Sequence, residues 1–171
     1  MNVRTRLLEA TDGEAFVAAA EASAELHRPW ATPAATPDAF DAYLARSQRD
    51  EHSCLVVVND ADDLIGVYNL SEIVRGAFQN AYLGYFAFVP FAGTGAMKAA
   101  MPLVFAHAFE ELGLHRLQAN VQPGNERSRR LLTGTGWREE GYAVRYLSVG
   151  GDWRDHVMYA ITAEEAPRHR A

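Results

Sequence analysis

The stretch of sequence that decides the fold is a glycine-rich turn between an apolar segment and a helical one, Phe88-Val89-Pro90-Phe91-Ala92-Gly93-Thr94-Gly95-Ala96-Met97. A strand that runs through such a turn into a helix brings unpaired backbone N–H groups and the positive end of the helix to one place. Gly93 and Gly95 can adopt positive φ and leave no side chain in the way of a ligand. The stretch predicts a backbone cradle for an anion, with an ordinary strand-to-helix turn as the alternative.

This turn does not match either of two familiar nucleotide-binding loops. No Gly-Lys-Ser/Thr follows it, as a Walker A loop requires, and Lys98 stands where a dinucleotide-binding fingerprint has its third glycine. Nucleotide hydrolysis and dinucleotide redox chemistry therefore lose support. A different diphosphate ligand remains.

Composition indicates one globular domain over residues 1–171, with a frayed tail from about residue 163. Hydrophobic residues make up 49% and charged residues 22% of the chain, and the net charge is -6. A negative charge argues against direct nucleic-acid binding. One cysteine permits no internal disulfide, and no apolar run is long enough for a membrane span or a signal peptide. We expect a cytoplasmic protein without membrane contact, either monomer or homodimer.

Local patterns around the turn predict a series of strands and helices. Alternating or β-branched runs predict strands at about 2–8, 54–58, 64–73, 81–89, 115–121, 139–147 and 153–161. Helical spacing and capping residues predict helices after Thr11-Asp12 and at 37–46, 96–112 and 125–132. Pro102 should bend the third of these helices. This order predicts an α/β fold, a mixed sheet with helices on its faces.

A second informative stretch lies downstream, Val121-Gln122-Pro123-Gly124-Asn125-Glu126-Arg127-Ser128-Arg129-Arg130-Leu131-Leu132, and Gly134-Thr135-Gly136-Trp137 follows it. Together with the glycine-rich turn it resembles the acetyl-CoA-binding motifs of the GCN5-related N-acetyltransferases (GNAT), in their RimJ/RimL branch. The likeness extends over about residues 7–161. The segments 74–76, 82–85, 125–132 and 151–157 are most similar to the RimJ group, which acetylates the N-terminal alanine of a ribosomal protein.

The resemblance implies a mostly antiparallel sheet of about seven strands with about four helices, acetyl-CoA as cosubstrate, and no metal. The cofactor contacts that it implies are Phe86, Ala87, Phe88, Gly93, Thr94, Gly95, Ala96, Met97, Asn125 and Arg130. The acetyl group would pass directly to a primary amine, most simply a protein N-terminus that begins with alanine or serine. A small-molecule amine (an antibiotic, polyamine or amino acid) and a non-catalytic acyl-CoA-binding module are the alternatives.

Three positions depart from the family pattern. Ala92 replaces the usual Gln or Arg at the start of the turn, Met97 replaces a small residue at its end, and Ala99 replaces a glutamate. Pyrophosphate binding would then depend on backbone amides, chiefly those of residues 93–97.

The candidate catalytic residues follow from the chemistry of amide formation, in which an amine loses a proton and a thiolate gains one. Many relatives use a tyrosine at the position of Leu132, whereas RimL-type relatives resemble this chain in using a serine. Ser128 is therefore the candidate thiolate protonator, with a solvated helix hydroxyl as the alternative. Asn125, three residues earlier, is the candidate partner of the pantetheine arm, a role compatible with capping the helix.

The residues that bind the acceptor amine and remove its proton are harder to identify from the sequence. Glu72, at the end of a strand that should flank the amine entrance, is the candidate general base, and an exposed strand-end charge is the simpler alternative. Trp30 and Tyr85 are expected to contact the acceptor, or in the case of Trp30 simply to pack. The resemblance implies that a backbone amide within residues 86–89 meets the oxyanion.

Other constellations carry less weight. Asp155 and His156 with Ser128 contain the residue types of a hydrolytic triad, but neighbours on a strand point to opposite faces. The six histidines have no metal-ligand spacing. Cys54 is expected to be a buried core thiol. The arginines at 127, 129 and 130 form either a solvated helix face or a contact with the 3′-phosphate of CoA.

Overall fold

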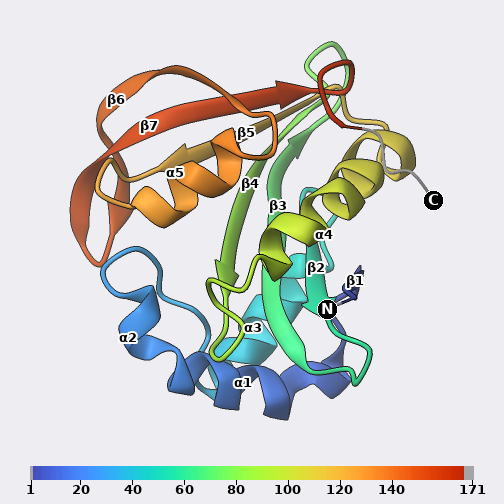
Figure 1. Cartoon of the computed structure of the whole chain (residues 1–171), viewed down its shortest axis with the longest axis vertical. Helices are drawn as coiled ribbons and strands as arrows, with labels where there is room; N and C mark the ends of the chain where they lie inside the picture. The colour runs from blue at the N-terminus through green and yellow to red at the C-terminus, as the bar shows by residue number, and fades with distance from the viewer. Residues whose placement is uncertain (1, 168–171) are drawn as a thin grey trace.

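The computed structural model describes residues 2–167, in which seven strands form one sheet between two groups of helices (Figure 1). The strands are β1 (Arg4–Leu7), β2 (Ser53–Val58), β3 (Leu64–Val74), β4 (Asn80–Ala87), β5 (Arg116–Val121), β6 (Arg138–Val149) and β7 (Asp152–Thr162). Their order in the sheet is β1-β2-β3-β4-β5-β7-β6, and every neighbouring pair is antiparallel except β4 and β5. The mixed, mostly antiparallel sheet of seven strands is thus confirmed.

Helices cover both faces of the sheet. The first group is α1 (Gly13–Ala22), α2 (Ala24–His27) and α3 (Pro37–Ser47), after a short 3-10 turn η1 (Ala10–Asp12). The second group is α4 (Ala96–Phe105), its π-helical continuation η2 (Ala106–Glu111) and α5 (Glu126–Thr133). Side chains that alternate along the central strands enter two separate core clusters, one on each face. The sheet therefore stands between two cores, in the arrangement that Figure 1 shows.

Most element boundaries follow the local signals in the sequence. Thr36 caps α3, because its hydroxyl accepts from the Ala39 amide at 3.2 Å, and Pro37 occupies the first helical position. Asn125 caps α5 in the same way, through the Ser128 amide at 3.2 Å. Such contacts lie within three residues of chain, so the sequence alone predicts them.

The helix expected over residues 96–112 departs from a regular α-helix. It contains Pro102 and changes to π-helical hydrogen bonding at Ala106, four residues later. Within η2 the buried side chain of His107 contacts Ser53 Oγ at 2.9 Å and Glu111 Oε2 at 2.7 Å. These polar contacts and the proline both oppose a uniform α-helical register.

The chain after β7 forms a hydrogen-bonded turn at the start of the tail that the sequence was expected to leave frayed. The amides of Glu165 and Ala166 donate to Thr162 O at 3.1 and 3.0 Å, and the Glu165 carboxylate pairs with Arg138. These contacts place residues 163–166 in a turn, and residues 168–171 of the tail expected to fray lie outside the described part. No helix within residues 2–167 has the length and apolar character that a membrane span requires.

Candidate active site

A gap between β4 and β5 forms the centre of the candidate site. The two strands pair only from Asn80 to Tyr82 on β4, and then diverge while β5 continues to Val121 (Figure 1). On its other edge β4 remains paired with β3 as far as Ala87. The later part of β4 therefore has one edge without a neighbouring strand.

The register of β4 shows which of its amides face this gap. Phe88 N donates to Ile65 O at 2.8 Å, and residues of an antiparallel pair alternate between bonded and non-bonded positions. The amide of Phe86 consequently points toward β3, whereas the amides of Tyr85 and Ala87 point into the gap. Val89 N donates to Ser23 Oγ at 3.0 Å. Of the residues 86–89 expected to supply an oxyanion donor, Ala87 alone keeps its amide directed at the gap.

The glycine-rich turn closes one end of the gap and has the geometry of an anion cradle. Gly93 and Gly95 adopt φ of 82° and 88°, and a Cβ at either position would meet no atom within 4 Å. Among residues 2–167, the amides of Gly93, Gly95, Met97 and Lys98 have no acceptor. Unpaired amides at the start of α4 fit a pyrophosphate.

Other parts of the turn are occupied by the protein itself. Thr94 Oγ1 donates to Phe91 O at 2.7 Å and lies 3.4 Å from the Ala96 amide. The side chains of Ala96 and Met97 are buried, and Met97 O accepts from the Tyr68 hydroxyl at 2.7 Å. These residues would therefore contribute to binding through backbone geometry, as the substitutions at Ala92 and Met97 led us to expect.

Helix α5 brings Asn125 and Ser128 to the same side of the gap. Asn125 Oδ1 is engaged by the Ser128 amide, while Asn125 Nδ2 donates to no group in the described part of the chain. The hydroxyl of Ser128 lies 2.6 Å from Tyr85 Oη. Sequence reasoning placed Asn125 and Ser128 together correctly.

Tyr85, the other residue expected to contact the acceptor, lies beside Ser128. Its hydroxyl is 2.6 Å from Ser128 Oγ and 3.2 Å from Ser128 O, on the α5 face of the sheet. Its ring packs against Tyr68 and the core on that face, and burial raises the pKa of the phenol. Tyr85 is therefore a hydrogen-bond partner of Ser128, and its contact with the acceptor stays a prediction.

Glu72 lies at a bulge where the register between β3 and β4 shifts. It adopts φ of 51° and is exposed. The preceding residue, Ser71, pairs with Tyr82 of β4. Its negative charge helps to raise the pKa of Tyr82 to about 12, although the main cause is the hydrogen bond between Tyr82 and Tyr146, whose hydroxyls are 3.3 Å apart. Glu72 is thus near the end of the gap where β4 and β5 separate. The hydroxyl pair was not foreseen, because Tyr146 is 64 residues away in sequence.

Trp30 lines a hollow of about 360 Å³ on the side of β6 and β7. A Cβ on Gly124 would lie 3.2 Å from the indole ring, so Trp30 covers the loop that leads from β5 into α5. The other lining residues are Gln122, Pro123, Tyr142, Trp153, Arg154 and Asp155. This position, open to solvent and next to α5, suits an entrance for the acceptor.

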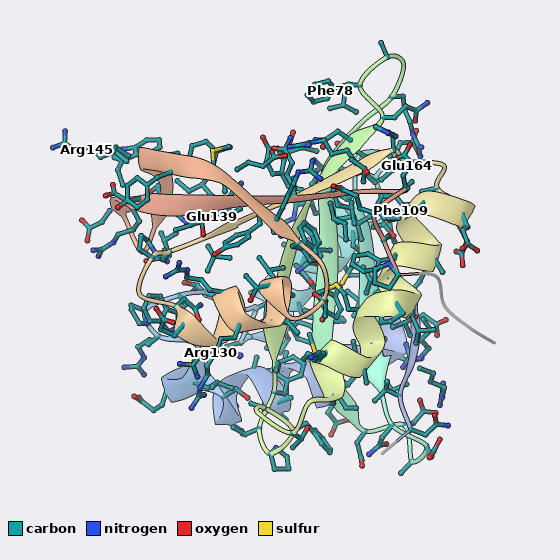
Figure 2. All side chains as sticks on the ribbon, turned by 45° about the horizontal axis from the view of Figure 1, so that its top comes forward. Phe78, Phe109, Arg130, Glu139, Arg145 and Glu164 are labelled. Atoms are coloured by element: carbon teal, nitrogen blue, oxygen red, sulfur yellow. The ribbon has the colours of Figure 1, made fainter. Side chains whose placement is uncertain are left out.

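Of the three arginines of α5, Arg127 and Arg130 are exposed and Arg129 is half-buried. Arg129 is engaged by Tyr159 Oη at 3.1 Å and by Glu126 at 3.3 Å. Arg130 is exposed, and Figure 2 shows it on the side of α5 that faces away from β6 and β7. The sequence reasoning missed Lys98, whose Nζ lies 3.3 Å from the Cβ position of Gly134, between α4 and the end of α5. Lys98 thus lies close to the end of α5, the helix that carries Arg130.

The alternative sites considered in the sequence, a hydrolytic triad, a reactive cysteine and a metal site, can be compared with the structure. His156 is buried and Asp155 is partly exposed, as opposite faces of β7 require, and Asp155 accepts from Tyr142 Oη at 2.7 Å instead. Cys54 is buried, and burial raises the pKa of its thiol to about 12. No group of three potential metal ligands occurs within residues 2–167.

Sequence comparisons agree with the geometry. A family model described as an acetyltransferase (GNAT) domain matches residues 2–138. The chain is 41% identical over 120 residues to a probable N-acetyltransferase, YjcK, of Bacillus subtilis, a match that covers 70% of this chain and 66% of that protein. It is 41% identical over 106 residues to the ribosomal protein uS5 alanine N-acetyltransferase of Escherichia coli, covering 62% of this chain and 55% of the relative. The aligned stretches span less than two thirds of either relative's length.

Solved structures show the same fold over nearly the whole chain. Mycobacterium smegmatis RimJ, solved in complex with CoA-disulfide, is 29% identical with a TM-score of 0.89 and covers 97% of this chain and 84% of its own. Spermidine N-acetyltransferase from Vibrio cholerae, in complex with CoA and spermine, has a TM-score of 0.79 at 19% identity and covers 95% of this chain and 96% of its own, which supports the fold. With the family model matched over most of its length, this chain belongs to the GNAT acetyltransferase family.

Proposed function

We propose that this protein is an acetyl-CoA-dependent N-acetyltransferase whose acceptor is the α-amine of a protein N-terminus. The observation that carries the proposal is that two sets of backbone hydrogen-bond donors border the same gap, the one between β4 and β5. The free amides of the turn at residues 93–98 lie at one end, and the inward amides of Tyr85 and Ala87 lie along its edge. An extended thioester with a pyrophosphate at one end fits such a site.

The reaction requires that an amine nitrogen attack a thioester carbonyl, that the C–S bond break, and that the nitrogen lose a proton while the sulfur gains one. The Ala87 amide is the proposed donor to the carbonyl oxygen as negative charge develops there. Ser128 is the proposed donor to the departing sulfur. Glu72 is the proposed acceptor of the amine proton, directly or through water.

A peptide acceptor is supported by the lining of the hollow at Trp30. Two indole rings, Trp30 and Trp153, line it, and Asp155 is its one carboxylate. That carboxylate already accepts from the Tyr142 hydroxyl and from the Arg145 amide at 2.8 Å. A polyamine carries several cations and would find few free anionic groups here, whereas a peptide backbone and an apolar side chain can lie against the rings.

The test is a competition between N-terminal peptides and small amines with acetyl-CoA as donor. We expect thiol release and mono-acetylated product with peptides that begin with alanine or serine. Trp30→Ala should raise the KM for the peptide and leave the KM for acetyl-CoA within about twofold, because the ring lies on the acceptor side. The matched control is Phe78→Ala, since Phe78 is 60% exposed at the remote β3–β4 turn (Figure 2).

Two outcomes would overturn parts of this proposal. Turnover of small amines alone would replace the peptide acceptor with a small-molecule one. Binding of CoA without turnover of any amine would identify the protein as a non-catalytic acyl-CoA-binding module.

A further inference from the structure

Two hydroxyl groups from different elements meet beside the gap. Tyr85 Oη, from β4, lies 2.6 Å from Ser128 Oγ and 3.2 Å from Ser128 O, on α5. The Tyr85 ring is held in the core of that face, with its centroid 5.4 Å from that of Tyr68. Packing of the ring therefore fixes the phenol against the serine.

These contacts determine where the serine hydrogen can point. A phenol has one hydrogen to donate, and a carbonyl oxygen can only accept. When Tyr85 donates to Ser128 Oγ, the hydrogen of Ser128 is free for another acceptor. When Tyr85 donates to Ser128 O, the serine hydrogen turns back to the phenol oxygen. Because burial raises the pKa of Tyr85, the phenol keeps its proton at neutral pH in both arrangements.

We propose that Tyr85 is a positioning residue that donates to Ser128 Oγ and so turns the serine hydrogen toward the departing sulfur, an inference that rests on the proposed acetyl transfer. Neighbouring hydrogen bonds polarise one another, so a hydroxyl that accepts a bond becomes a stronger donor. As the C–S bond breaks, its electron pair passes to sulfur. Ser128 supplies the proton to the thiolate and regains one from solvent, while Tyr85 retains its own.

A double-mutant cycle tests this inference. Tyr85→Phe removes the hydroxyl and keeps the ring, so we expect kcat to fall about tenfold, the equivalent of one hydrogen bond. The Kd for CoA should stay within about twofold. In the Ser128→Ala background the same change should lower kcat no further, because its effect acts through the serine.

The control is Tyr159→Phe, which removes another buried hydroxyl that contacts α5. Tyr159 is hydrogen-bonded to Arg129 and Glu139, and no hydrogen bond joins it to Ser128 or Tyr85 within residues 2–167, so the variant should retain kcat within about twofold. An equal loss of kcat from Tyr85→Phe with and without Ser128 would overturn the inference, since the phenol would then act independently.

A second measurement does not need turnover. The thiol of bound CoA can be titrated by the ultraviolet absorbance of its thiolate, which a hydrogen bond from Ser128 stabilises. Tyr85→Phe and Ser128→Ala should each raise this thiol pKa by about one unit, and Tyr159→Phe should not change it. Identical titrations in wild type and Tyr85→Phe would contradict the inference. A wild type that binds CoA but acetylates no amine defeats the proposed function, and the titration still decides the role of Tyr85.

Discussion

His27 Nε2 lies 2.8 Å from the carbonyl oxygen of Ala87, and this contact joins α2 to the last residue of β4. Because a carbonyl can only accept, Nε2 carries the hydrogen, and Nδ1 is buried without a partner in the described residues. The imidazole packs edge-on against the rings of Phe86 and Phe88. The segment that leads to Trp30 is therefore anchored on the strand that borders the candidate active site.

This anchor should contribute measurably to stability. His27→Leu leaves the Ala87 carbonyl without its donor, and we expect a loss of about 1–3 kcal/mol in the free energy of unfolding. His27→Gln keeps an N–H donor at the end of the side chain and should recover part of that loss. Denaturant unfolding of the three proteins provides the measurement, and equal midpoints for wild type and His27→Leu would show that the contact contributes nothing.

The same histidine predicts a pH dependence of stability. Burial lowers the pKa of His27, and its contact with Ala87 O opposes this only in part. The unfolded chain, with a histidine pKa of about 6.5, then binds a proton more readily than the folded one. The contribution of His27 should be constant above about pH 6.5 and fall as the pH drops from there to the folded pKa. In His27→Gln this acid-side loss should be smaller, and unchanged acid sensitivity would exclude His27 as its source.

Gly95 tests the anion cradle. Gly95→Val strains the backbone, because Gly95 has φ of 88°. It also places a side chain in the open space in front of the unpaired amides of the turn. We expect the Kd for CoA, measured by calorimetry, to rise at least about tenfold, because the phosphate must approach the backbone. Gly76→Val is the matched control, since Gly76 has φ of 71° and equally open surroundings in the turn between β3 and β4. Equal CoA affinity in both folded variants would refute the cradle.

Asn125 allows two roles to be separated. Asn125→Ala removes the cap of α5 and should cost about 1 kcal/mol of stability as well as CoA affinity. Asn125→Asp keeps an oxygen for the Ser128 amide but loses the Nδ2 donor. If Nδ2 binds the pantetheine arm, the aspartate variant should keep the stability of wild type and bind CoA more weakly. Wild-type affinity in Asn125→Asp would restrict Asn125 to its capping role.

Glu72 is tested as the general base through the pH profile of kcat/KM. Glu72→Gln keeps the shape of the side chain and removes its basicity, so the rate should fall by about 10² or more and the acid limb should disappear. His156→Asn is the comparison, because His156 Nδ1 is 3.0 Å from Arg154 O and its Nε2 makes no hydrogen bond within residues 2–167. An acid limb that persists in Glu72→Gln but vanishes in His156→Asn would transfer the role to the histidine.

Local signals in the sequence predicted most of the secondary structure. The caps at Thr36 and Asn125 depend on contacts across three residues, and the strand pairs β2–β3 and β6–β7 depend on turns between adjacent segments. The structure adds detail to the prediction where residues distant in sequence make contact. In the helix after Pro102, His107 contacts Ser53. In the turn at residues 163–166, Glu165 pairs with Arg138.

By itself the sequence determined the order of strands and helices along the chain and a glycine turn able to expose amides at Gly93 and Gly95, because these follow from short-range chemistry. The family was indicated by the resemblance of its two motifs. Only the tertiary structure decided which amides of β4 remain free, since that depends on where β5 diverges and on what Ser23 and His27 occupy. The tertiary structure likewise gave Ser128 its partner Tyr85, 43 residues away. The physical reason is that the two hydroxyls approach each other only when α5 packs on the sheet, and no local pattern records that contact.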